Sequence, residues 1–187
     1  MRLAQSTTFR AKRSGVLLAC AGAALALGVL SPSAAAPPAL VGPTDYLTTS
    51  SPDAVAIGDL NGDGRPDVVG TSDAYDDTLS AVLGNGDGTF RHWRDYAAEL
   101  HPASVAIGDV NGDGKADLVT ANEGDGSVTV LLNGSFETKR DYATGDTPLS
   151  VAIRDLNGDA RPDLITANTD GNNVSVLLNK GRRAFPA

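Results

Sequence analysis

Short apolar segments recur along this chain, and polar, glycine-rich turns separate them. In the clearest segment, Val128, Val130 and Leu132 alternate with Thr129 and Leu131. Side chains that alternate in this way lie on opposite faces of a β-strand. Runs of helix-favouring residues are absent after the N-terminal segment. The pattern therefore predicts an all-β fold of short strands joined by tight turns.

One succession of segments occurs three times. The strand-like sequence that ends at Asp59 recurs before Asp109 and before Asp155, so the repeats are spaced by 50 and 46 residues. Periods of this size are typical of propeller blades. The later strands of each repeat are expected at 68–71, 118–121 and 164–167 (second), at 79–83, 128–132 and 174–178 (third), and from Phe90, Phe136 and Phe185 onward (fourth).

Each repeat therefore contains four strands. Glycine follows asparagine directly, or after one residue, in the turn between the third and fourth strands, and Asn-Gly steps favour tight hairpins between antiparallel strands. The sequence predicts repeated four-stranded antiparallel blades of β-propeller type, with the three repeats at about residues 53–102, 103–148 and 149–187.

Tyr46 marks a segment that has no blade in front of it. It lies 13 residues before the first aspartate of the acidic motif that follows, and Tyr96 and Tyr142 keep the same spacing. Residues 45–49 are therefore predicted to be a fourth strand that closes the last blade of this chain or of another copy. Propellers close with roughly four to eight blades. Three possibilities stay open: an open arc, a homo-oligomer whose copies share one ring, and a truncated gene.

The N-terminal residues have the layout of a secretory signal peptide. Four basic residues precede an apolar run of 16 residues, from Gly15 to Leu30, and small residues follow as far as Ala36. An uncleaved anchor is less favoured, because a spanning helix needs roughly 20 apolar residues. We expect a signal peptide at 1–36, a linker at 37–44 and a repeat domain at 45–187.

Removal of residues 1–36 would change the cysteine content and the net charge of the chain. Its only cysteine, Cys20, would be lost, and the net charge would change from -8 to -12. An exported chain without disulfides needs another way to hold its loops, and bound metal is the obvious candidate. A strongly acidic chain repels nucleic acid and anionic membranes and attracts divalent cations. We therefore expect no nucleic-acid partner, and no membrane insertion after signal cleavage.

An acidic motif of nine residues follows the first strand of each repeat. Oxygen-bearing side chains occupy its first, third, fifth and ninth positions, and glycines allow the tight backbone path. With the carbonyl of the seventh residue and two oxygens from the ninth, each motif offers roughly the six to eight oxygens that Ca²⁺ prefers. The predicted Ca²⁺ ligands are Asp59, Asn61, Asp63, Arg65 and Asp67, then Asp109, Asn111, Asp113, Lys115 and Asp117, then Asp155, Asn157, Asp159, Arg161 and Asp163.

Other interpretations of the motif are weaker. An EF-hand needs a glutamate at the twelfth position, where this chain has Gly70, Thr120 and Thr166, and it needs flanking helices. Asp-Asn-Gly runs also form turns without any metal, and this alternative stays open. In the third motif Ala160 replaces a glycine, so we expect a less strained or altered loop that binds metal last or most weakly.

Two segments carry a resemblance to a known family. The sequences Val105–Gly114 and Gly86–Phe90 resemble the FG-GAP or VCBS repeats of integrin-α-like β-propellers, and the resemblance extends over residues 45–187. It implies calcium-stabilised blades on exported or cell-surface proteins that often serve adhesion, or the binding of carbohydrates and proteins.

The sequence offers little support for catalysis. His92 and His101 lack a cysteine or serine partner motif, so we expect both at the surface. Trp93 is expected to pack between blades or to be exposed rather than to stack on a sugar. We expect a secreted or cell-surface, non-enzymatic, calcium-binding repeat protein that mediates adhesion to a protein or glycan ligand. The alternative is an accessory or truncated propeller domain of a larger exported enzyme.

Overall fold

The computed structural model describes residues 42–46, 51–72, 77–132, 136 and 138–181, except for the side chains of His92 and Trp93. The chain divides into two units, Met1–Pro43 and Thr44–Ala187. The predicted signal peptide, residues 37–41 of the predicted linker and residues 47–49 of the predicted closing strand lie outside the described residues. Within the described part, no helix is long and apolar enough to cross a membrane.

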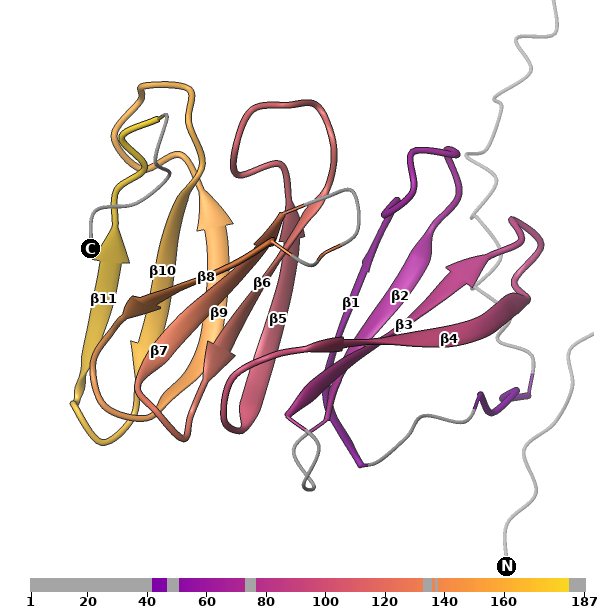
Figure 1. The fold of residues 1–187 in the computed structure, drawn as a ribbon, viewed down its shortest axis with the longest axis horizontal. Coiled ribbons are helices and arrows are strands. Elements are labelled where there is room, and N and C mark those ends of the chain that lie inside the picture. Colours follow the sequence, from indigo (N-terminus) through magenta and orange to yellow (C-terminus); the bar gives the residue numbers. More distant parts are fainter. Residues whose placement is uncertain (1–41, 47–50, 73–76, 133–135, 137, 182–187) are drawn as a thin grey trace, which may run out of the picture. The chain divides into compact units, whose positions relative to one another are not determined.

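The described residues of the second unit form strands and no helices, and the strands group into three antiparallel sheets (Figure 1). Blade I has the order β1-β2-β3-β4, blade II has β5-β6-β7-β8, and blade III has β11-β10-β9. The strands are β1 (Pro52–Gly58), β2 (Asp67–Ser72), β3 (Thr78–Gly84) and β4 (Phe90–Ala97); β5 (Pro102–Gly108), β6 (Asp117–Asn122), β7 (Ser127–Leu132) and β8 (Thr138–Ala143); and β9 (Pro148–Arg154), β10 (Asp163–Asn168) and β11 (Asn173–Leu177).

The prediction of an all-β fold with blades of antiparallel strands is confirmed. Blades I and II contain the four strands expected, and blade III contains three within the described residues. The fourth strand predicted from Phe185 lies outside them. Each blade also has a register shift where its first strand begins, at Pro52, Pro102 and Pro148. The three blades therefore share the same strand pairing, including this irregularity.

Each sheet has two faces with different neighbours. We call the face turned toward the preceding blade the leading face, and the opposite one the trailing face. On blade II, the leading face contributes Val105, Leu118 and Leu131 to a buried cluster with Val69 and Leu79 of blade I. Neighbouring side chains of a strand point to opposite faces, so the residues next to these three belong to the trailing face.

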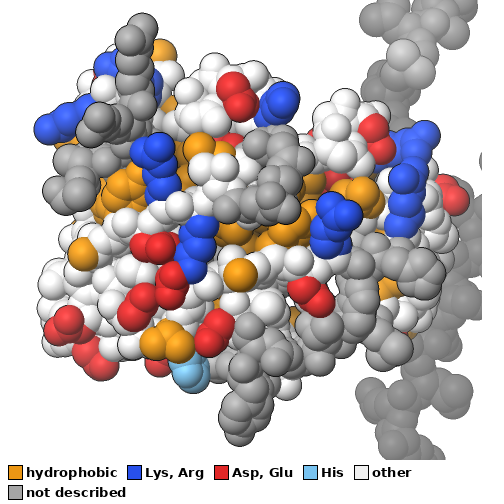
Figure 2. Space-filling view, viewed as in Figure 1, with side chains coloured by type: hydrophobic (Ala, Val, Ile, Leu, Met, Phe, Trp, Pro, Cys, Tyr) orange, Lys and Arg blue, Asp and Glu red, His pale blue; other side chains and the backbone are white. Residues whose placement is uncertain are grey.

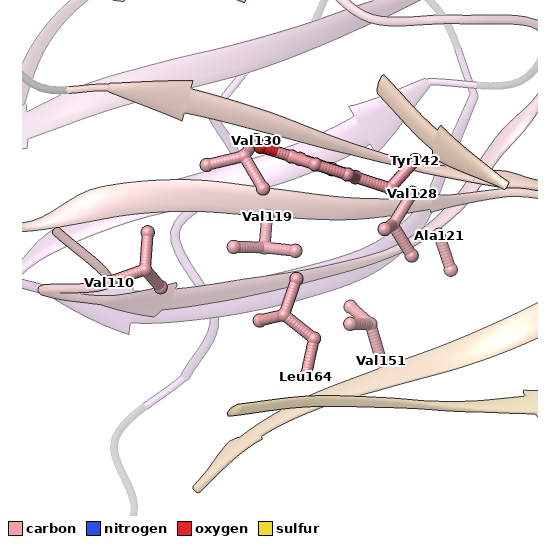
Figure 3. Packing of buried hydrophobic residues seen from close by; sticks show 8 residues of the cluster. All are labelled: Val110, Val119, Ala121, Val128, Val130, Tyr142, Val151 and Leu164. Atoms are coloured by element: carbon pink, nitrogen blue, oxygen red, sulfur yellow. The ribbon is translucent and has the colours of Figure 1, made fainter. Parts of the chain in front are cut away.

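The trailing face of blade II packs against blade III in the same way. Val119, Val128 and Val130 form a second buried cluster with Val151 and Leu164 of blade III (Figure 3). The same pair of faces thus meets twice in the molecule, once between blades I and II and once between blades II and III.

Glycines at the ends of two first strands permit this close approach. A Cβ atom at Gly58 would lie 3.0 Å from Cγ2 of Ile107, and one at Gly108 would lie 3.2 Å from Cδ1 of Ile153. Both distances are shorter than ordinary van der Waals contact, so a larger residue would push the next blade outward.

Candidate metal-binding loops

The three acidic motifs occupy equivalent loops, each joining the first two strands of a blade. The loops lie between β1 and β2, between β5 and β6, and between β9 and β10 (Figure 1). The ninth residue of each motif, Asp67, Asp117 or Asp163, is also the first residue of the second strand. The fold therefore places all fifteen predicted ligands in three separate, equivalent loops.

In the first loop, side-chain oxygens bind backbone amides. Asp59 Oδ1 accepts hydrogen bonds from the amides of Gly62 (2.8 Å) and Asp63 (3.1 Å), and its Oδ2 accepts one from Gly64 (2.8 Å). Asn61 Oδ1 accepts from the Asp63 amide at 2.8 Å, and Asp63 Oδ1 accepts from the Arg65 amide at 2.9 Å. These bonds hold the tight turn and fix the positions of the oxygens.

The other two loops repeat the arrangement. Asp109 Oδ1 and Oδ2 accept from the amides of Gly112 and Gly114 at 2.7 and 2.8 Å. Asp155 Oδ1 and Oδ2 accept from the amides of Gly158 and Ala160 at 2.8 and 2.9 Å. The hydrogen bond from Gly158 is the largest of the effects that lower the pKa of the Asp155 carboxyl below its ordinary value.

The ninth aspartate of the motif has a different role from the other three. Asp67 is fully buried; its Oδ2 accepts from the Leu60 amide (2.8 Å) and its Oδ1 from the Gly84 amide (2.7 Å). Asp163 is also fully buried and accepts in the same way from Leu156 (3.0 Å) and Asn179 (2.8 Å). This carboxylate therefore ties the loop to the end of the third strand, a role that the sequence pattern did not indicate.

The expectation of a less strained third loop is wrong, and the alteration of the loop is small. Ala160 has φ 63°, in the same left-handed region as Gly64 (79°) and Gly114 (81°). Its amide also makes the same bond to the first aspartate of its motif. The hydrogen bonds of the loop hold the backbone path, and the alanine accepts the strain of a conformation that favours glycine.

Replacing Ala160 with glycine is expected to stabilise the protein by about 0.5 to 1 kcal/mol, because it removes that strain at a smaller entropic cost. Denaturant unfolding in the presence of a chelator measures the change. The reverse substitution at the equivalent position, Gly114→Ala, is the matched variant and is expected to destabilise. Equal stabilities for Ala160→Gly and the parent chain would contradict the strain.

The donor chemistry of the loops suits a hard cation such as Ca²⁺. A carboxylate or amide oxygen that accepts one amide hydrogen bond keeps a second lone pair for a cation. In the first loop, the side chains of Asn61 and Asp63 are exposed. However, no group of three or more His, Cys, Asp or Glu side chains is gathered as a metal site among the described residues. The metal assignment therefore stays a prediction.

A comparison with known protein families matches the segments that contain these loops. The FG-GAP-like repeat matches residues 59–120 and 109–166, so each match begins at the first aspartate of an acidic motif and runs into the second strand of the next blade. The chain belongs to the FG-GAP-like repeat family. No curated protein matches it.

Asn179 contributes to these FG-GAP-like repeats in a way that sequence reasoning did not single out. It is 3% exposed, and its Nδ2 donates to the carbonyl oxygens of Val110 (2.7 Å) and Pro162 (3.1 Å). Because Val110 follows β5, this side chain joins blade III to blade II. In the sequence, Asn85 and Asn133 occupy the equivalent positions of the first two repeats, where an Asn-Gly step indicates only a turn.

The leading faces of the FG-GAP-like repeats bury connected polar side chains. In blade II, Asn122 Nδ2 donates to Ser127 Oγ (2.9 Å) and Thr129 Oγ1 (2.8 Å), and its Oδ1 accepts from Thr120 Oγ1 (2.8 Å). Thr129 Oγ1 also donates to Asp141 at 2.7 Å. A related network in blade III involves Thr166, Asn168, Asn173 and Ser175.

A cavity of about 250 Å³ lies beside the second and third loops of this FG-GAP-like chain. Val110, Val130 and Leu132 supply apolar walls, and Arg140 and Arg161 supply positive charge. Figure 2 shows hollows of this character, in which apolar side chains lie with Lys and Arg side chains beside them. Arg161 also pairs with Asp159 at 3.2 Å.

A turn before β4 holds one further carboxylate with a shifted pKa. Asp87 Oδ1 accepts from the Thr89 hydroxyl (2.6 Å) and the Thr89 amide (2.9 Å), and these bonds lower the pKa of Asp87. The hydroxyl is the largest cause. The stability from this contact is present above the ordinary pKa of an aspartate, and is lost as the pH falls through the lowered folded-state pKa.

The variant Thr89→Val is expected to raise the pKa of Asp87 toward its ordinary value, because valine keeps the amide but removes the hydroxyl donor. A carboxyl ¹³C NMR titration measures the pKa directly. The carboxyl of Asp155 is the internal control, since backbone amides rather than Thr89 lower its pKa. An unchanged Asp87 titration in the variant would show that the hydroxyl has no such role.

Proposed function

We propose that this FG-GAP-like repeat chain is an exported, non-enzymatic protein whose three loops bind Ca²⁺, and that its blades mediate adhesion to a protein or glycan. The observation that carries the proposal is the threefold repetition of one loop geometry. In each loop, backbone amides donate to the side chains of an aspartate, an asparagine and a second aspartate, at the same positions of the motif.

In this proposal, each loop binds its cation through the first, third and fifth side chains and the carbonyl of the seventh residue. Asp59, Asn61, Asp63 and Arg65 form the first such set. Ca²⁺ supplies positive charge among carboxylates that repel one another, so binding and folding are linked. The buried ninth aspartate positions the loop, because its two oxygens accept amide hydrogen bonds in the first and third loops. Each of these oxygens accepts a single amide and keeps a second lone pair, so Asp67, Asp117 and Asp163 stay in the predicted set of ligands.

Calcium binding is expected to raise the melting temperature of the protein above its value in chelator. A site occupied at 100 times its Kd adds about 2.7 kcal/mol of stability. Asp63→Asn, Asp113→Asn and Asp159→Asn together are expected to remove most of this shift, because each changes an exposed ligand. Asp53→Asn is the matched control, since Asp53 is an exposed acid outside the loops. An identical melting temperature in excess Ca²⁺ and in chelator would refute the proposal.

The binding role is tested separately from the metal. Immobilised glycans and candidate surface proteins are probed with the chain in Ca²⁺ and in chelator, and retention only in Ca²⁺ is expected if intact blades present the ligand site. Export is supported by the N-terminal sequence, in which basic residues, an apolar run and small residues follow one another before Pro37. N-terminal sequencing of the protein from culture medium tests export, and a new N-terminus near residue 36 or 37 is the expected result.

A further inference from the structure

The leading face of blade I exposes side chains whose equivalents are packed in the other blades. On β1, Val55 is 65% exposed and Ile57 is 69% exposed. The equivalent residues of blade II, Val105 and Ile107, pack against blade I, and Val105 is only 7% exposed. In blade III the equivalent of Val55 is Val151, which is 8% exposed. Blade I therefore presents a leading face without the neighbour that the other two leading faces have.

The trailing face of blade III is exposed in the complementary way. Val174 is 65% exposed and Val176 is 51% exposed. Their equivalents in blade II, Val128 and Val130, are 0% exposed because blade III covers them. Exposed apolar side chains that gather on one face of a sheet mark interaction surfaces.

Tyr46 supplies an independent observation. Its ring meets Phe90 of blade I edge to face at 5.1 Å, as the ring of Tyr96 meets Phe136 of blade II at 5.0 Å. Tyr96 belongs to β4, the last strand of the blade that precedes its partner. Tyr46 thus lies where the last strand of a blade before blade I would lie.

The cross-strand partners of Tyr96 and Tyr142 indicate which residue of a preceding blade Tyr46 would pair with. Tyr96 is the cross-strand partner of Leu79 in blade I, and Tyr142 is the cross-strand partner of Val128 in blade II. The equivalent residue of blade III is Val174, on the exposed side of β11. Within the described residues, β11 is an edge strand, and such edges invite pairing.

We propose that a second copy of this chain packs head to tail on the first, with the leading face of its blade I on the trailing face of blade III. In this contact Tyr46 of one copy pairs with Val174 of the other. The two surfaces are the two halves of an interface that the molecule already makes twice internally. The described blades of two copies number six, within the roughly four to eight that close a propeller, whereas those of three copies would exceed that range. The expected assembly is a closed dimer with two equivalent contacts.

Arg154 makes the contact between copies differ from the internal ones. It occupies the position of Gly58 and Gly108, where a Cβ atom would approach an isoleucine of the next blade to 3.0 or 3.2 Å. The partner must therefore shift slightly at this point, and the contact between copies is weaker than the contacts within a chain. Arg154→Gly is expected to tighten the dimer several-fold.

The test measures molar mass by light scattering over a range of concentrations, with the mature chain in Ca²⁺. The parent chain is expected at twice its chain mass. Ile57→Asp and Val176→Asp each place a charge on one of the two faces and are each expected to give monomers. Leu100→Asp is the control, because Leu100 is 48% exposed and lies between β4 and β5. Circular dichroism checks that each variant is folded.

A mixture of the two face variants distinguishes head-to-tail packing from other contacts. The intact trailing face of Ile57→Asp meets the intact leading face of Val176→Asp, so the mixture is expected to form dimers that neither variant forms alone. Variants that never complement, or a dimer that only one of them disrupts, would overturn head-to-tail packing. A parent chain that stays monomeric at every concentration would overturn the proposal, and would assign these faces to further repeats. Calcium binding is tested separately by the melting temperature, so a failure of the calcium proposal can be told apart from a failure of the dimer proposal.

Discussion

Replacing Asp67 with alanine is expected to lower the free energy of unfolding by about 3 to 5 kcal/mol, even in the presence of a chelator. The carboxylate is fully buried, and it accepts the amides of Leu60 and Gly84 at 2.8 and 2.7 Å. Alanine leaves both amides without these acceptors, and a buried donor that loses its partner costs its desolvation. Urea unfolding followed by circular dichroism measures the loss.

Asp63→Ala is the matched control for that experiment. Asp63 belongs to the same loop, but its side chain is exposed, so water can replace the hydrogen bonds that it makes. In chelator its removal is expected to cost about 0.5 to 1.5 kcal/mol. A similar loss for the two variants in chelator would contradict the distinct structural role of the ninth aspartate. A loss at Asp67 that appears only in Ca²⁺ would assign that residue to the metal instead.

The strands of this protein were predictable because their causes are local. Alternation over five residues, as in Val128 to Leu132, specifies a strand and its two faces, and β7 lies where the pattern places it. The period of the repeat then groups the strands into blades, and the structure has the expected antiparallel order. Both signals are read within one repeat or by comparing repeats, and neither requires knowledge of distant contacts.

The role of the buried aspartates was not predictable from the motif. Spacing showed that Asp67 could reach the other oxygens of its loop, but the partner on its far side is Gly84, which lies 17 residues away at the end of β3. The link from Asn179 to Val110 spans 69 residues and joins two blades. The first contact depends on how strands pair within one sheet, and the second depends on how two sheets stack. A pattern confined to one loop carries no information on either.

The conformation of Ala160 illustrates a different limit. Residue type argued for a relaxed turn, since alanine avoids positive φ. The surrounding hydrogen bonds to Asp155 and Asp159 instead keep the turn, and the alanine adopts φ 63°. A local preference of about 1 to 2 kcal/mol is too small to override a network of several hydrogen bonds.

Replacing Leu118 with alanine is expected to cost about 3 kcal/mol, and to do so by weakening the contact between two blades. Leu118 is 0% exposed and lies on the leading face of blade II, in one cluster with Val69 and Leu79 of blade I. Truncation removes apolar contacts and leaves a cavity that the two packed sheets cannot easily close. Thermal and urea unfolding measure the loss and the number of transitions.

The matched control is Leu100→Ala, the same chemical change at a side chain that is 48% exposed between β4 and β5. It is expected to cost less than about 0.5 kcal/mol, as surface substitutions usually do. In a stack of repeats, stability is shared between each repeat and its interfaces with neighbours. If Leu118 supports the interface, its variant unfolds at lower urea and separates blade I from the other two as an early transition. Equal costs for the two leucines would show that blades I and II are stable without the contact that joins them.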